Sequence, residues 1–154
     1  MFFFPNGAYN YSLYTVPVAW ILSLTPHLYA VNRWNSLRKD EWDNSNPRGF
    51  LNQLQKKEKL TKEEKVIVRA EAAQQNGFEN LPFFAVALLA GNYAKLSNST
   101  LNNLAATYLI TRAFYNLAYI KIDNNRLAPI RTVLFLSGIG CCFTLFVKSA
   151  NALF

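Results

Sequence analysis

The chain has 154 residues, of which 51% are hydrophobic and only 16% are charged. Soluble domains typically carry about 25% charged residues, so the composition argues against an ordinary soluble fold and, at this length, indicates a single domain. The net charge of +7 is not accompanied by any recognisable nucleic-acid-binding motif, which argues against a nucleic-acid partner.

Four long apolar stretches follow one another along the chain, each long enough for the roughly 20 residues that cross a bilayer. They predict helices at about 8–31, 62–94, 100–122 and 127–153, with a connector over 32–61. The expected fold class is therefore all-α, an integral membrane four-helix bundle. A single histidine and only two cysteines argue against a metal site such as zinc. The adjacent Cys141 and Cys142 are expected to act as small apolar fillers.

Basic residues are concentrated in the connector over 32–61 and in the turn before the last stretch. The positive-inside rule therefore places both connections in the cytosol and both termini on the other side of the membrane. Basic connectors at a cytosolic leaflet also predict an interaction with anionic membrane lipids.

The connector itself contains several local signals. A turn is expected at Asn46-Pro47-Arg48-Gly49, and a short amphipathic piece at Leu51 to Leu54. Thr61 and Glu64 have the spacing of a capping box, so the second helix is expected to start near Lys62. Aromatic side chains of this region are expected at headgroup depth; they are Trp34, Trp42 and Phe50.

A polar stripe crosses the second stretch. Arg69, Ala73, Asn76 and Glu79 stand at i, i+4, i+7 and i+10, which predicts that they share one helical face. Pro82 follows and is expected to kink the helix. Ionisable groups at membrane depth usually face a bundle interior or a wet cavity, so this stripe is interpreted either as a polar ligand site or as contacts that hold helices together.

A second polar stripe ends the third stretch, where Arg112, Tyr115 and Tyr119 stand at i, i+3 and i+7. Arg126 and Arg131 follow in the next turn and in the start of the fourth helix. The topology brings both stripes to the cytosolic end of the bundle. Spacing alone leaves two interpretations open, a ligand site and ion pairs that set helix register.

These residues carry a resemblance to a known family. Arg69, Ala73, Asn76 and Glu79, followed by Leu81-Pro82-Phe83-Phe84, resemble the motif of the MAPEG family, the membrane-associated proteins of eicosanoid and glutathione metabolism. The second stripe and the segment from Arg126 to Arg131 also match, and Asn46-Pro47-Arg48 is similar to a branch shared by bacteria and fungi. The resemblance covers nearly the whole chain, 1–154, as one MAPEG-like domain.

The resemblance implies a homotrimer that binds glutathione at its subunit interfaces, in the cytosolic half. Arginine guanidiniums suit the two carboxylates of glutathione, Glu79 is expected to receive its ammonium, and Asn76 to add hydrogen bonds. The family's thiolate-stabilising arginine maps to Arg131, with Arg126 as the alternative because the turn here is longer. The remaining glutathione-binding positions are implied to be Arg69, Arg112, Tyr115 and Tyr119.

Two departures from the family pattern bear on function. Ala72 stands where the well-known members have an arginine, and Val68 where they have an acid. Arg33, Arg38 or Arg48 is expected to substitute for the missing arginine if glutathione binding is retained.

The leading hypothesis is a microsomal glutathione transferase-like enzyme that conjugates glutathione to apolar electrophiles, reduces lipid hydroperoxides, or does both. The alternative is a non-catalytic scaffold or lipid-binding subunit. The expected compartment is the endoplasmic reticulum, with the mitochondrial outer membrane as the alternative, or the inner membrane of a bacterium.

Overall fold

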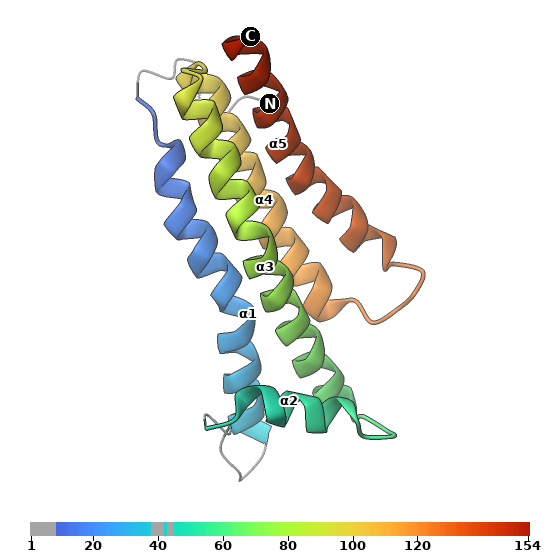
Figure 1. Ribbon diagram of the computed structural model, residues 1–154. Coiled ribbons are helices and arrows are strands. Elements are labelled where there is room, and N and C mark those ends of the chain that lie inside the picture. Colours follow the sequence, from blue (N-terminus) through green and yellow to red (C-terminus); the bar gives the residue numbers. More distant parts are fainter. Residues whose placement is uncertain (1–8, 38–41, 43–44) are drawn as a thin grey trace.

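A computed structural model describes residues 9–37, 42 and 45–154, apart from the side chains of Pro47 and Arg48. Within these residues the fold is all-α and contains no strand. The elements are a 3-10 turn, η1 (Ser12–Tyr14), and five helices: α1 (Thr15–Leu37), α2 (Pro47–Gln55), α3 (Lys62–Tyr93), α4 (Asn98–Lys121) and α5 (Pro129–Leu153). Figure 1 shows the four long helices running side by side, with the short α2 lying across one end.

Helix α3 is the longest element and the centre of the packing, since it contacts α1, α4 and α5. Its start at Lys62 confirms the prediction from the capping box. The Thr61 hydroxyl accepts from the backbone N–H of Glu64, and the Glu64 carboxylate accepts from the backbone N–H of Thr61 at 2.9 Å. The helix continues through Pro82 without a break.

Two donors hold the buried Glu64 carboxylate. Lys57 donates from its ammonium at 2.9 Å, and Thr61 adds its backbone N–H. The hydrogen bond from Lys57, followed by that from the Thr61 backbone, lowers the pKa of Glu64 from 4.5 to about 2. This contact ties the segment after α2 to the first turn of α3.

The first helix differs from its expected range of 8–31, because α1 begins at Thr15 and ends at Leu37. The residues before it form hydrogen bonds to asparagine side chains instead of a regular helix. The backbone N–H of Tyr11 donates to Asn102 at 2.8 Å, and the Asn102 amide donates to the carbonyl of Tyr9 at 2.8 Å. These bonds fix the N-terminal segment against the start of α4.

The connector over 32–61 is more structured than expected. The Asn46 side chain caps α2 by accepting from the backbone N–H of Gly49 at 2.9 Å, and Pro47 occupies the first turn. Asparagine at the cap and proline just inside it are the residues that helix N-termini favour. The segment expected to form a turn is therefore the start of a helix that also contains the short amphipathic piece.

Two groups of buried side chains form the core. In the half away from α2, the ring of Phe84 stacks on Tyr108 with centroids 3.8 Å apart. The same group includes Cys141 and Cys142, which are buried and not bonded to each other. The second group lies at the α2 end and consists of Ala30, Trp34, Trp42, Leu54, Ile67 and Ala70.

Trp34 and Trp42 are buried within the fold, and their expected position at headgroup depth stays a prediction. They are 6% and 4% exposed, and each ring packs on Phe50 with centroids 4.7 Å apart. The physical reason is α2, which brings Phe50 back over the end of α1 and allows three aromatic rings to bury one another.

Among the helices of the described residues, α5 is the one that is both long enough and apolar enough by itself to cross a membrane. The other three long helices contain more polar residues, which lowers their average hydropathy below that of α5. The expectation of four membrane spans therefore remains a prediction for α1, α3 and α4.

Candidate functional site

Arg112 lies at the centre of the polar residues brought together by α4. Its side chain comes from the buried face of the helix and is 5% exposed. The guanidinium sits 4.6 Å from the centroid of the Tyr115 ring. Within the described part of the chain, its Nε and Nη2 groups have no hydrogen-bond partner. Buried donors without acceptors are costly, so these two groups indicate a place where an acceptor fits.

Arg131, in the first turn of α5, packs on a tyrosine ring in the same way as Arg112 does. Its guanidinium lies 4.7 Å from the centroid of Tyr119, and the rings of Tyr119 and Tyr115 are 5.4 Å apart. One Nη2 donates to the carbonyl of Ile122, while Nε has no partner among the described residues. Arg112, Tyr115, Tyr119 and Arg131, which we call the arginine cluster, thus alternate two guanidiniums with two phenol rings.

The stripe on α3 contributes unequally to this region. Ala73 is fully buried and Arg69 and Asn76 are half-buried, but Glu79 is exposed. A helix turns by about 100° per residue, so Glu79, ten residues after Arg69, lies roughly 80° away from it around the axis. The expectation that all four share one face therefore holds for Arg69, Ala73 and Asn76, and Glu79 lies at the edge.

The polar side chains of α3 also have partners within the chain. Arg69 Nε donates to the carbonyl of Ile120 at 3.1 Å, and the Asn76 amide donates to the carbonyl of Ala72 at 3.0 Å. Glu79 accepts from the Gln75 amide at 2.9 Å.

The other arginines named from the sequence lie elsewhere. Arg126 is exposed in the turn before α5, where its backbone N–H donates to the Asn124 side chain at 2.9 Å. Arg33 forms an ion pair with Glu63 at 2.9 Å. Arg38 and the side chain of Arg48 lie outside the described residues. Arg33 is therefore the one described candidate to replace the arginine absent at Ala72, and within one chain it is paired with Glu63 instead of joining the arginine cluster.

Sequence reasoning missed a second polar contact, between α1 and α3. His27 Nδ1 and Glu71 Oε1 are 2.7 Å apart, and the Glu71 side chain is only 8% exposed. The ring of His27 also packs edge to face on the ring of Trp42, with the two centroids 5.7 Å apart. The available signal was that Glu71 is a carboxylate inside a polar stretch of α3 and that His27 is the single histidine of the chain.

The arginine cluster offers hydrogen-bond donors and positive charge but contains no nucleophile of its own. Planar guanidiniums bind carboxylates and phosphates through paired hydrogen bonds, and phenol rings hold guanidiniums by cation–π contact. The arrangement is therefore suited to binding an anion and to stabilising negative charge next to Arg131.

Comparison with known proteins gives one family. Neither the curated proteins nor the solved structures include a match to this chain. The family model described as the MAPEG family matches residues 12–151, which include every residue of the arginine cluster and of the α3 stripe. The chain therefore belongs to the MAPEG family and is a membrane protein of that family.

Proposed function

We propose that the protein is a glutathione-dependent membrane enzyme that conjugates glutathione to apolar electrophiles, reduces lipid hydroperoxides, or does both. The observation that carries the proposal is the buried Arg112 guanidinium, whose Nε and Nη2 groups have no acceptor among the described residues. Membership of the MAPEG family supports glutathione as the source of that acceptor, since members of the family generally use it.

The residues present fit glutathione in charge and in hydrogen-bonding capacity. The free donors of Arg112 and Arg131 match the acceptors of its carboxylates and thiolate. In the proposed site, Arg69 and Arg112 bind carboxylate, Glu79 binds the ammonium, and Asn76 adds hydrogen bonds. Tyr115 and Tyr119 form the wall and hold the two guanidiniums in place by their ring faces.

Bound glutathione supplies a thiol that reacts as its thiolate. A guanidinium stabilises a neighbouring anion without taking up its proton, and we assign this role to Arg131. Its Nε has no partner within the described chain, and Tyr119 restricts its position. Arg126, the alternative, is exposed in the turn and its side chain has no comparable support.

The proposed assembly is a homotrimer of four-span subunits with its sites at the cytosolic side of subunit interfaces. The exposure of Glu79, at the edge of the α3 face, supports a site that a neighbouring subunit completes. A substitute for the arginine absent at Ala72 would then come from the partner. The proposed compartment is the endoplasmic reticulum, with the mitochondrial outer membrane as the alternative.

The decisive experiment is a titration of the detergent-solubilised protein with glutathione near neutral pH, following thiolate ultraviolet absorbance. We expect a saturable signal from the wild-type protein. S-methylglutathione, which has no free thiol, is the control ligand. It should give heat of binding in calorimetry but no thiolate absorbance. In Arg131→Gln the absorbance should be lost while the heat with S-methylglutathione persists.

A second function, a non-catalytic scaffold, is favoured by a specific observation. Arg69 and Arg131 both donate to backbone carbonyls at the end of α4, those of Ile120 and Ile122, which is a structural use of charge. If neither glutathione nor S-methylglutathione produces heat or absorbance, the enzyme proposal fails and the scaffold is the function that remains.

A further inference from the structure

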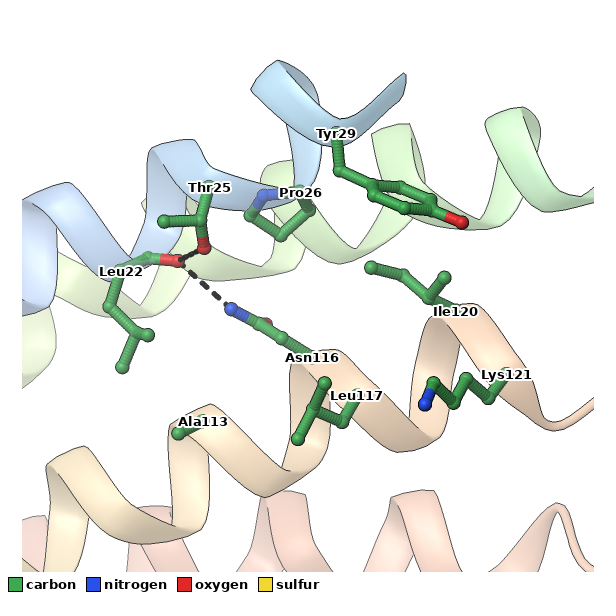
Figure 2. Close-up of a pocket in the computed structure, with 9 residues that line it drawn as sticks. All are labelled: Leu22, Thr25, Pro26, Tyr29, Ala113, Asn116, Leu117, Ile120 and Lys121. Carbon is green, nitrogen blue, oxygen red and sulfur yellow. Dashed lines mark hydrogen bonds between the residues drawn. The ribbon is translucent and has the colours of Figure 1, made fainter. Parts of the chain in front are cut away.

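A groove between α1 and α4 lies on a different face of α4 from the arginine cluster. Its volume is about 370 Å³, within the range of roughly 300–1,000 Å³ typical of small-molecule sites. Figure 2 shows the residues that line it, which are Leu22, Thr25, Pro26, Tyr29, Ala113, Asn116, Leu117, Ile120 and Lys121.

Two side-chain hydrogen bonds to one backbone carbonyl fix the inner wall of the groove. Pro26 lies inside α1 and has no backbone N–H, so the carbonyl of Leu22, four residues earlier, loses its helical donor. Two side chains replace that donor: the Thr25 hydroxyl at 2.8 Å and the Asn116 amide at 2.9 Å. The hydrogen bond from Asn116 joins α4 to α1 next to Pro26. It therefore holds the two walls of the groove in a fixed position relative to each other.

The two ends of the groove differ in polarity. Leu22 and Ala113 lie at one end, whereas Tyr29 and Lys121 lie at the other (Figure 2). Lys121 belongs to the last turn of α4, on the side of the molecule where α2 lies. Its side chain is exposed, and no carboxylate of the described residues pairs with it. The lining therefore suits an amphiphile with an anionic head and an apolar tail.

We propose that the α1–α4 groove binds one acyl chain of an anionic phospholipid, with the headgroup phosphate on Lys121. Lipid surrounds the spans of a membrane protein, and the groove is lined at its mouth by the exposed side chains of Leu117 and Tyr29. An apolar wall alone gives little preference between protein and bulk lipid, since both are equally apolar. Selectivity must therefore come from the charge of Lys121, and it does not depend on the glutathione proposal.

The test uses full-length protein reconstituted in phosphatidylcholine vesicles that contain phosphatidylglycerol, then extracted gently and analysed by native mass spectrometry. We expect wild-type protein to retain phosphatidylglycerol in preference to phosphatidylcholine. Lys121→Gln should reduce that preference about fivefold, the factor given by the ~1 kcal/mol that one lysine contributes at an anionic surface. Lys148→Gln removes the same charge from α5, outside the groove, and should retain the preference.

A second pair of variants tests the acyl chain. Ala113→Phe fills the groove and should reduce retention of both lipids, whereas Phe114→Trp enlarges an exposed neighbour on α4 and should leave retention unchanged. Equal phosphatidylglycerol preference in wild type and Lys121→Gln would overturn the proposal. So would crosslinking of Leu117→Cys between two chains, because a second copy would then occupy the groove. If Ala113→Phe does not fold, the exposed Lys121 variant alone decides.

Discussion

Two polar clusters, one where α3 meets α4 and one where α4 meets α5, differ in how completely their hydrogen bonds are satisfied. Figure 1 shows these two junctions at opposite ends of the long helices. Near the junction of α3 and α4, the asparagine cluster comprises Asn10, Ser12, Asn92 and Asn102. Asn102 uses both its oxygen and its amide on the N-terminal backbone, and Asn92 donates to the fully buried Ser12 at 3.1 Å. The arginine cluster at the other end leaves buried donors without acceptors.

The difference follows from the side chains that each cluster uses. An asparagine amide is short and matches the backbone in both donors and acceptors, so a folded segment can satisfy it completely. A guanidinium has five donors and no acceptor, and the tyrosine ring faces that hold Arg112 and Arg131 accept charge without accepting those donors. The asparagine cluster, whose hydrogen bonds are satisfied, is therefore expected to stabilise the fold. The arginine cluster, which has donors left over, is expected to bind an anionic ligand.

The largest expected effect is on turnover in Arg131→Ala. If the guanidinium stabilises the thiolate, its loss should lower conjugation of an aryl halide electrophile by about 10²–10³-fold, as for other preorganised electrostatic groups. Steady-state rates of the purified protein measure this, and chemical crosslinking checks that the proposed homotrimer is unchanged from wild type. Arg126→Ala is the matched control, and similar losses in both variants would show that Arg131 has no special role.

Arg112→Met should separate binding from stability. Its charge-assisted hydrogen bonds to a carboxylate are worth about 1.5–3 kcal/mol, so affinity for S-methylglutathione should fall roughly tenfold to a hundredfold. Thermal stability without ligand should stay equal or rise, because an apolar side chain of similar size removes buried, unsatisfied donors. Calorimetry and thermal unfolding give the two numbers. A strongly destabilised variant with unchanged affinity would make Arg112 a structural residue.

Asn102→Leu should give the reverse pattern. The change leaves the Tyr11 N–H and the Tyr9 carbonyl without their partners, at a cost of about 1–3 kcal/mol of unfolding free energy. Glutathione affinity should not change, because the proposed site lies at the other end of the molecule. Asn151→Leu, at an exposed position of α5, controls for the loss of an amide. If Asn102→Leu weakened binding as well, the two ends would be coupled.

The sequence predicted the parts of this comparison that depend on local pattern. The capping box at Thr61 and Glu64 and the start of α3 at Lys62 are found where spacing placed them. The arginine cluster was also predictable, because spacing along α4 brings Arg112, Tyr115 and Tyr119 together. Contacts between distant segments were not. The pairing of His27 with Glu71 depends on how α1 and α3 pack, which no local pattern specifies.

The smallest expected effect concerns the Glu64 carboxylate, whose two oxygens both accept hydrogen bonds. Because the pKa of Glu64 is lowered to about 2 in the folded protein, its contribution to stability is fully present above pH 4.5 and is lost as the pH falls toward 2. Glu64→Gln keeps one acceptor oxygen for the capping box, and it removes the charge and the second of the two oxygens that accept from Lys57 and Thr61. It should cost less than about 1 kcal/mol near neutral pH, since Lys57 is half exposed.

Thermal unfolding in detergent across pH 2–5 tests this, and the variant should lose less stability than wild type over that window. Glu63→Gln, at the neighbouring position, removes the same charge from an ion pair open to solvent on both sides. It therefore separates the loss of this buried carboxylate from a general change in net charge. Identical acid profiles for wild type and Glu64→Gln would mean that Lys57 and Thr61 do not hold the carboxylate in solution. Complete hydrogen bonding in the folded chain would then be a poor guide to which polar groups stabilise this protein, at Asn102 as well as at Glu64.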